Sequence, residues 1–316
     1  MPDQGHKGES KSMYKNCTTN ETKSQVSKIL QKTKIKKMLN ADVVAWLCSI
    51  GETDRAQRIS DCATHIGITE IDGYAKIIKA DFCRERLCNV CAWRRQTKFV
   101  AQMFPALEIL SKDYEFLFVT LTMRSVQIGE LKQAIDIMLK GYDRFLKHRQ
   151  VQRGWAGKVR GLEMKYNTKT RTFNPHIHIL VAVSKDYFET KTKYVSHAEL
   201  VRCWGESIRA DYLPRCEVKK VTETQGAVVE TLKYSFKQMT DSTAMQGFHT
   251  ALKNRRLVSF SGVFAEIRKL LRQSDFENIL TDDIPEDTPR KIMYTLYRFD
   301  ATGGVYNYYK ELEYER

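Results

Sequence analysis

The sequence predicts an α+β protein built on a central antiparallel sheet with flanking helices. Runs of β-branched and aromatic residues, which are typical of strands, occupy 115–122, 159–166 and 176–183. Apolar residues at helical spacing lie between and after these runs, at 128–149, 197–210, 226–239 and 263–271. The spacing of strands and helices is irregular, which favours an antiparallel sheet over a regular βαβ alternation. A polar loop, 167–174, is expected to join the second and third strands.

The chain is strongly basic, and the charge lies mainly in its central part. It has 316 residues, 42% of them hydrophobic, and 52 basic against 38 acidic residues, for a net charge of +14. Residues 1–40 hold nine lysines and three acids, whereas residues 274–316 hold ten acids and five bases, which leaves +13 for residues 41–273. Such an excess attracts polyanions and says nothing about fold. We therefore expect a phosphate-bearing partner bound by the central part.

No segment predicts export or membrane insertion. The amino terminus, MPDQGHKGES, lacks the apolar stretch of a secretory signal, and the longest apolar runs, 116–119 and 177–183, are too short to span a bilayer. A soluble cytoplasmic protein is expected, with no membrane partner. Its eight cysteines would stay reduced in the cytoplasm, so clustered cysteines indicate metal binding or catalysis.

Two histidines lie two residues apart on the third predicted strand. Because side chains alternate along a strand, His176 and His178 face one side and Ile177, Ile179 and the valines after them face the other. Two imidazoles on one sheet face can bind a divalent metal with one further ligand, for which Glu163 on the preceding strand is the best local candidate. The alternatives are half-buried histidines on an edge strand beside an exposed glutamate, or the two-histidine, one-carboxylate site of an iron oxygenase.

The segment 226–239 predicts an amphipathic helix with a chemically suggestive polar face. Glu230, Tyr234 and Lys237 cluster opposite the apolar stripe on a helical wheel. A phenol is a weak nucleophile near neutral pH, and a lysine one turn away favours its phenolate and can contact a phosphate. Glu230 can act as a general base for a second nucleophile such as water. Taken alone, the same trio is more often found on a helix face that is merely solvated.

Four cysteines have spacings that suit a structural zinc. Cys83, Cys88 and Cys91 follow one another closely, and Cys62 lies 20 residues before the first of them. Four thiolates favour a closed tetrahedral Zn²⁺ site, and the alternative is reduced cysteines in a small apolar core. The residues that follow, Trp93, Arg94 and Arg95, would then be projected toward phosphates.

These motifs occur in an order that resembles a known family. The strand FLFVTLT (116–122), the strand NPHIHIL (174–180) and the helix ETLKYSFK (230–237) look like the three motifs of plasmid rolling-circle replication initiators, the Rep branch of the HUH endonuclease superfamily. The cysteine-rich segment 82–95 and the motif FSGVF (260–264) are similar to the Rep class that has one catalytic tyrosine and a nearby glutamate. The resemblance covers about residues 58–270. Asn174 departs from it, because relatives often have another histidine there.

The resemblance implies a metal-dependent, site-specific DNA endonuclease and strand transferase. His176, His178 and Glu163 would hold Mg²⁺ or Mn²⁺ against the scissile phosphate. Tyr234 would attack the scissile phosphate, form a 5′-phosphotyrosine link and release a 3′-hydroxyl that primes DNA synthesis. Lys237 would neutralise phosphate charge. Glu230 would activate water at termination. The expected substrate is a hairpin or single-stranded nick site at a plasmid origin.

The resemblance also implies a domain organisation and partners. We expect a partly disordered basic leader (1–40), a cysteine-rich, zinc-binding DNA-contact region (41–112), an HUH nuclease domain (113–273) and an acidic C-terminal segment (274–316). No Walker motif is present in the sequence, so a host helicase and replication machinery are expected as partners, and a homodimer is left open. Rival functions are a transposase or relaxase of the same superfamily and a non-catalytic zinc-stabilised DNA-binding regulator.

Overall fold

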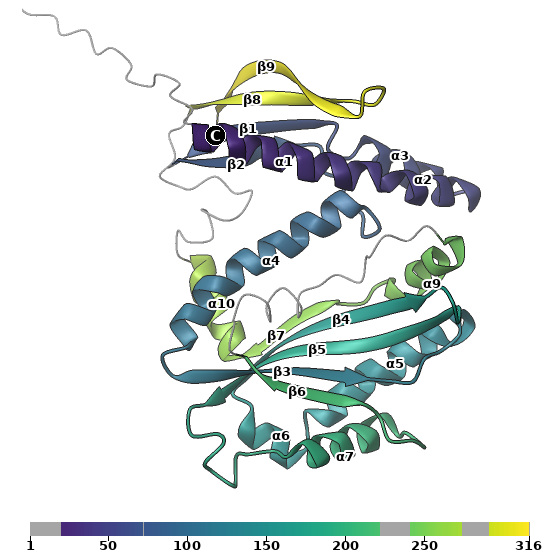
Figure 1. The fold of residues 1–316 in the computed structure, drawn as a ribbon, viewed down its shortest axis with the longest axis vertical. Coiled ribbons are helices and arrows are strands. Elements are labelled where there is room, and N and C mark those ends of the chain that lie inside the picture. Colours follow the sequence, from purple (N-terminus) through teal and green to yellow (C-terminus); the bar gives the residue numbers. More distant parts are fainter. Residues whose placement is uncertain (1–19, 72, 222–240, 274–290, 316) are drawn as a thin grey trace, which may run out of the picture.

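Two antiparallel sheets lie at opposite ends of the molecule and are joined by helices (Figure 1). The structure, a computed structural model, describes residues 20–71, 73–221, 241–273 and 291–315. Within these ranges it confirms an α+β chain with antiparallel sheets and flanking helices. No helix in the described ranges is long and apolar enough to cross a membrane.

The larger sheet has five strands in the order β6-β3-β5-β4-β7, with β5 at its centre. Its strands are β3 (Tyr114–Thr122), β4 (Gly157–Asn167), β5 (Thr172–Ser184), β6 (Cys216–Lys220) and β7 (Val258–Gly262). The three predicted strands are confirmed as β3, β4 and β5. The loop between β4 and β5 is shorter than expected, because β5, which carries the histidines, already begins at Thr172. Phe173 at this end forms a β-bridge with Val126, and its ring centroid lies 4.8 Å from that of Tyr166.

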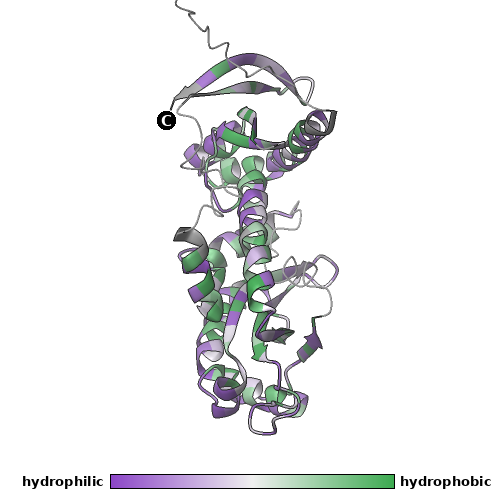
Figure 2. Cartoon of the chain, turned by 90° about the vertical axis from the view of Figure 1, so that its left-hand side faces the viewer, coloured by the Kyte–Doolittle hydropathy of each residue, from purple (hydrophilic) through white to green (hydrophobic). Residues whose placement is uncertain are grey.

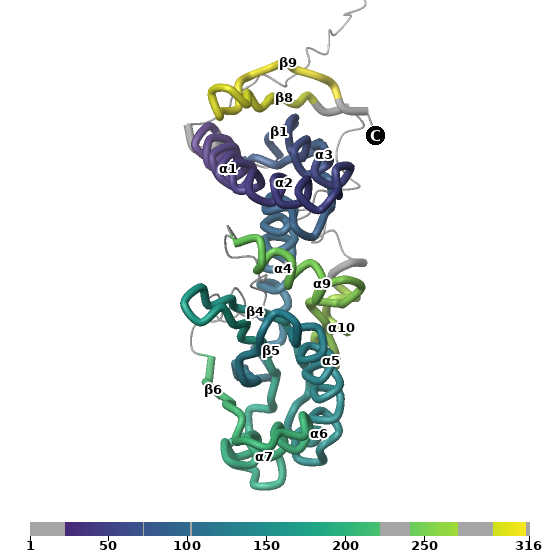
Figure 3. The backbone as a smooth tube through the Cα atoms, turned by 90° about the vertical axis from the view of Figure 1, so that its right-hand side faces the viewer, coloured from purple at the N-terminus to yellow at the C-terminus, as the bar shows by residue number. Residues whose placement is uncertain are grey.

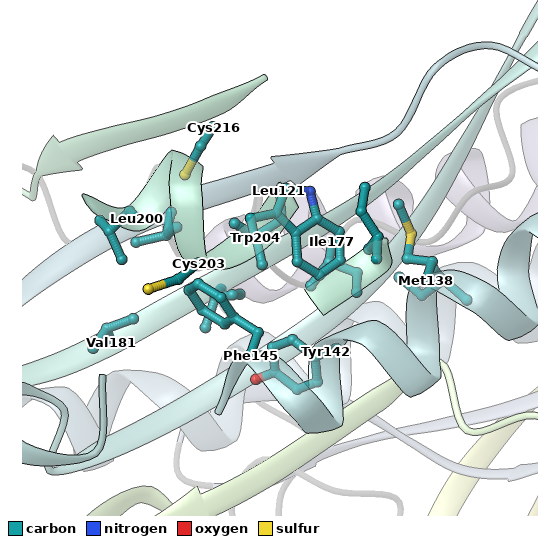
Figure 4. Close-up of a cluster of buried hydrophobic side chains, with 14 of the residues drawn as sticks. Leu121, Met138, Tyr142, Phe145, Ile177, Val181, Leu200, Cys203, Trp204 and Cys216 are labelled. Atoms are coloured by element: carbon teal, nitrogen blue, oxygen red, sulfur yellow. The ribbon is translucent and has the colours of Figure 1, made fainter. Parts of the chain in front are cut away.

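The main hydrophobic core fills one face of the larger sheet. It is covered by α5 (Ile128–Phe145), α6 (Arg149–Gly154), α7 (His197–Ile208) and α9 (Ser242–Leu252). The alternation of β5 directs Ile177, Val181 and their alternate neighbours into this core, where Phe145 and Trp204 meet edge to face with ring centroids 5.9 Å apart (Figure 4). The single helix expected over 128–149 is two helices, since α5 ends at Phe145 and α6 starts at Arg149.

The opposite face of the larger sheet is covered in part by two further helices. α4 (Asn89–Leu110) and α10 (Val263–Gln273) pack on it through a smaller core that includes Leu107, Leu180 and Phe264. Leu180 lies two residues beyond His178 on β5 and therefore on the same face. The histidines thus share their face with the contact zone of α4 and α10.

The smaller sheet brings together residues from both halves of the sequence. Its order is β2-β1-β8-β9, formed by β1 (His65–Ile71), β2 (Tyr74–Ala80), β8 (Lys291–Asp300) and β9 (Val305–Glu315). β1 pairs with β8 in a register that places His65 opposite Arg298. Most of the acidic C-terminal segment is therefore a hairpin that extends the sheet of the cysteine-rich region.

Three helices from the amino-terminal part pack beside the smaller sheet. They are α1 (Asn20–Met38), α2 (Asn40–Ser49) and α3 (Thr53–Asp61), and α1 lies below the β8–β9 hairpin (Figure 3). Within the basic leader expected over 1–40, the described part begins with α1, which starts at Asn20. Lys37 Nζ donates hydrogen bonds to the carbonyl oxygens of Ser60 (2.7 Å) and Cys62 (2.8 Å), which ties α1 to the end of α3.

Helix α4 runs between the two ends of the molecule (Figure 2), and α9 contacts the amino-terminal end. α4 starts at the cysteine-rich region and ends on the larger sheet. On α9, the His249 ring meets that of Trp46 edge to face at 5.7 Å and its Nδ1 lies 3.4 Å from Arg55 Nη1. Arg86 also donates a hydrogen bond to the Leu252 carbonyl oxygen at the end of α9. The cysteine-rich region is thus fixed to a helix of the larger sheet's core.

Candidate functional site: a histidine–glutamate sheet face and a cysteine centre

The hairpin of β4 and β5 brings Glu163 to the two histidines. Glu163 is paired with His176, and its Oε2 lies 2.7 Å from Nε2 of His178. Gly161, which is paired with His178, has no side chain, so the Glu163 carboxylate can reach His178 diagonally. Glu163 thus lies beside both histidines, as the direct cross-strand partner of His176 and in contact with His178.

The neighbouring strand β3 holds His178 from its other side. The Thr120 hydroxyl on β3 lies 3.1 Å from Nδ1 of His178, and the ring of Phe118 stacks on the imidazole at a centroid distance of 5.4 Å. His178 is 4% exposed and Glu163 is 2% exposed. The orientation of this buried pair is therefore fixed by packing and hydrogen bonds on both ring nitrogens.

His176 is arranged differently, with one ring nitrogen committed to the backbone. Its Nδ1 lies 2.8 Å from the carbonyl oxygen of Pro175, so Nδ1 donates and Nε2 keeps a lone pair in the neutral ring. Burial lowers the pKa of His176 more than this hydrogen bond raises it. A neutral imidazole with a free Nε2 is the form that binds metals.

Glu163 is held as a carboxylate. Burial alone would raise its pKa, but the hydrogen bond and charge of His178, followed by the charge of Lys165, bring the pKa of Glu163 below its ordinary value. Lys165 Nζ lies 3.4 Å from Glu163 Oε2. A donor set of two imidazoles and one carboxylate can bind a divalent transition metal and leave coordination positions open.

The ligand atoms of the histidine set are not gathered as closely as those of the cysteines. Within the described residues, the group whose ligand atoms all lie within 4.8 Å of one another is Cys62, Cys83, Cys88 and Cys91. The rings of His176 and His178 have centroids 6.0 Å apart and planes at 82°. The His178–Glu163 contact is thus preformed, and His176 flanks it.

The four cysteines have the spacing of a tetrahedral metal centre. The Sγ atoms of Cys62 and Cys91 lie 3.6 Å apart, and those of Cys83 and Cys91 lie 3.7 Å apart. Four sulfurs placed about 2.3 Å from a central zinc would be about 3.8 Å from each other. These sulfurs are free thiols, too far apart for a disulfide, and the cluster could hold a metal such as zinc.

Local structure stabilises thiolates at this centre. Cys88 is the N-cap of α4 and Cys91 lies in its first turn, where the helix dipole favours negative charge. The amide of Asn40 donates to Cys88 Sγ at 3.3 Å, as does the backbone N–H of Cys91 at 3.5 Å. Hydrogen bonds from the thiols of Cys62, Cys83 and Cys91 hold the pKa of Cys88 well below its ordinary value. Sequence reasoning missed Asn40, because no spacing rule links it to cysteines nearly fifty residues away.

The two arginines after the cysteines are not projected outward as the sequence predicted. The Arg94 guanidinium stacks on Phe82 with its carbon 3.9 Å from the ring centroid, and burial lowers its pKa to about 10. Arg95 donates to the carbonyl oxygens of Arg84 (3.3 Å) and Glu85 (3.2 Å). Trp93 is half-buried. Because both guanidiniums fold back on the loop that carries Cys83, they brace this loop.

The motif FSGVF forms the junction of β7 and α10. Gly262 has φ +57°, and a Cβ there would lie 2.1 Å from the carbonyl oxygen of Ala156. Gly157, its cross-strand partner on β4, also has no room for a side chain, since a Cβ there would lie 2.6 Å from Val263 Cγ2. Gly262 lets α10 start directly at the end of β7 and fold back over the sheet.

The predicted tyrosine helix, with Glu230, Tyr234 and Lys237, lies outside the described residues. The chain is described up to Val221, whose N–H donates to the Phe116 carbonyl oxygen at 2.9 Å, and again from Asp241, which caps α9. The roles expected for these three residues therefore remain predictions.

Comparisons with known proteins point to one family. The family model described as "Replication protein" matches residues 74–307. "Protein rep" of Streptococcus pneumoniae serotype 2 is 32% identical over 235 residues, which cover 70% of this chain and 73% of that protein. "Protein rep" of Bacillus amyloliquefaciens is 30% identical over 255 residues, covering 71% and 75%, and a "Replication protein" of Staphylococcus aureus is 30% identical over 187 residues, covering 53% and 80%. No solved structure matches.

Proposed function

Because the chain belongs to the replication protein family, we propose that it initiates rolling-circle replication of a plasmid by nicking one strand of the origin. The observation that carries this proposal is the buried His178–Glu163 contact beside His176 on one sheet face. A preformed carboxylate–imidazole pair next to a neutral imidazole is a suitable site for a divalent cation in a nuclease.

In this proposal the chain's own residues divide the work. Glu163, His178 and His176 would hold Mg²⁺ or Mn²⁺, which when bound polarises the scissile phosphate and stabilises transition-state charge. The Tyr234 phenol oxygen bonds to phosphorus while the bond to the 3′-oxygen breaks, and that oxygen leaves as a hydroxyl. Lys237 neutralises phosphate charge. The product is a 5′-phosphotyrosine and a primer end for synthesis.

Glu230 would serve a second step in the same site. It lies one helical turn before Tyr234 in the predicted helix, where a carboxylate can accept a proton from water. Water activated in this way would cleave the regenerated origin and leave a 5′-phosphate and a free 3′-hydroxyl. That hydroxyl would then attack the phosphotyrosine, which closes the DNA strand and releases the Tyr234 phenol. The cysteine centre would bind a structural Zn²⁺ and keep the amino-terminal region folded.

The test is covalent capture of origin DNA. The chain is incubated with a labelled hairpin from the origin of its plasmid and Mn²⁺, and the denatured mixture is examined for a DNA–protein adduct. Tyr234→Phe should abolish the adduct and retain DNA binding, whereas Tyr194→Phe, a change at an exposed tyrosine, should leave the adduct intact. An adduct that persists in Tyr234→Phe would remove the residue from this role. Glu230→Ala should still nick and should fail to release closed product.

A further inference from the structure

A basic cleft lies at the β7 edge of the larger sheet, outside the histidine site. It has a volume of about 720 Å³ and is bounded by β7, α4 and α10. Among its eight lining residues, three are cations, Arg256, Arg268 and Lys269, and none is an acid. Its size is in the range of ligand clefts, and its charge suits an anion.

Arg268 is fixed within the cleft by two aromatic rings. Its guanidinium carbon lies 4.4 Å from the ring centroid of Phe260 and 5.5 Å from that of Phe99, and the two rings are 5.9 Å apart. Stacking of this kind holds a guanidinium, and with it a positive charge, in one plane. Arg256 and Lys269 are exposed and add two mobile charges. The arrangement is typical of a backbone phosphate contact.

The cleft and the histidines lie on the same face of the sheet. Val258, which lines the cleft, is paired with Gly161, and Gly161 is paired with His178. Residues paired directly across strands point to the same face, and each strand spacing is about 4.8 Å, so Val258 and His178 are about 10 Å apart. A nucleic-acid strand whose phosphate is held at the histidines can therefore reach the cleft within a few nucleotides.

We propose that this cleft binds the phosphate backbone of single-stranded DNA that runs over β7 from the nick site. The proposal rests on the proposed function for its substrate and adds a binding site to it. A recessed site suits a single strand, because reading a duplex requires an element that protrudes into a groove. Arg268 adds a positive charge held in place by Phe260 and Phe99, and Arg256 and Lys269 contribute one phosphate contact each.

The test measures the salt dependence of binding without added Mg²⁺ or Mn²⁺, so that covalent chemistry does not contribute and the cysteine centre keeps its zinc. Fluorescent oligo(dT) and a duplex of unrelated sequence are titrated with the full chain and with the double variant Arg256→Ala/Lys269→Ala. Each lost phosphate contact lowers the slope of log K against log salt by about 0.7 on a single strand. We expect a slope smaller by about 1.4 and a several-fold lower affinity for oligo(dT). The matched control is Arg153→Ala/Lys191→Ala, at exposed sites on the far side of the core, and should behave as the wild type.

Two results would overturn the proposal: an oligo(dT) slope equal to that of the control, or a loss confined to the duplex. Arg268→Lys keeps the charge and loses the planar stack, and we expect it to weaken oligo(dT) binding with little change in slope. Covalent capture with the same variants separates this inference from the nuclease. A wild-type chain that shows the salt effect but no adduct would support the cleft and contradict the proposed nicking activity alone.

Discussion

Nε2 of His178 and Oε2 of Glu163 lie 2.7 Å apart, although the two residues are diagonal neighbours and not direct partners in the sheet. The direct partner of His178 is Gly161, and the direct partner of Glu163 is His176. One carboxylate therefore serves both histidine positions, and a cation that replaces the shared proton would keep both ligands in nearly the same place.

Replacement of the Glu163 carboxylate should weaken binding of the divalent metal and leave the fold intact. Glu163→Gln retains a hydrogen-bonding group of the same shape for His178 and removes the negative charge. We expect the Mn²⁺ concentration for half-maximal adduct formation to rise at least about tenfold. Glu115→Gln removes another sheet carboxylate, the one paired with Lys220 at 2.9 Å, and should have no such effect. An unchanged Mn²⁺ requirement in Glu163→Gln would exclude it as a ligand.

The histidine–glutamate face could be predicted because its information is local. The alternation of β5 sets which side His176 and His178 face, and a short connection forces β4 and β5 into a hairpin that brings Glu163 near. The same local patterns located the three central strands and most of the helices around them.

Long-range pairing could not be predicted in the same way. Strand β8 pairs with β1 across more than two hundred residues, and β9 pairs with β8. The alternation of apolar and polar residues along β8 does not indicate which strand it pairs with. Arg94 shows the same limit, since its stacking on Phe82 is a contact that motif spacing does not encode. In each case a tertiary contact decided the outcome.

Zinc removal should destabilise the amino-terminal end of the molecule. We expect about one zinc per chain, lost together with the paired change Cys88→Ser/Cys91→Ser. A structural zinc contributes several kcal/mol, so the thermal midpoint should fall by on the order of 10 °C. Cys48→Ser, at an exposed free thiol, is the control and should keep both zinc and midpoint. Elemental analysis and thermal unfolding measure the two effects, and zinc retained in the double variant would refute the assignment.

The contact between α9 and α2 should weaken in mild acid through His249. Burial, followed by the charges of Arg55 and Lys253, lowers the pKa of His249, although Glu52 and Glu85 oppose this shift. As pH falls below about 6.5, the unfolded chain takes up a proton before the folded chain does, so stability decreases until the folded pKa is reached. The lowered pKa of Glu85 acts at more acidic pH, because its ordinary value is 4.5. His249→Gln should therefore reduce the loss of urea stability between pH 7.5 and 5.5, and an equal loss in both proteins would contradict this role.

The β7–α10 junction should be intolerant of any side chain at Gly262. Gly262→Ala places a Cβ 2.1 Å from the Ala156 carbonyl oxygen in a left-handed backbone conformation. A left-handed residue alone costs about 1–2 kcal/mol, and the backbone clash adds to it, so we expect a loss of more than about 2 kcal/mol. Gly304→Ala has a similar φ of +60° with no atom within 4 Å, and should lose only about 1 kcal/mol. Gly262 sets the start of α10 and so the position of Arg268, so Gly262→Ala should also bind oligo(dT) more weakly. Equal free energies of unfolding for Gly262→Ala and Gly304→Ala would contradict the prediction, because they would show that the junction relaxes around the added Cβ.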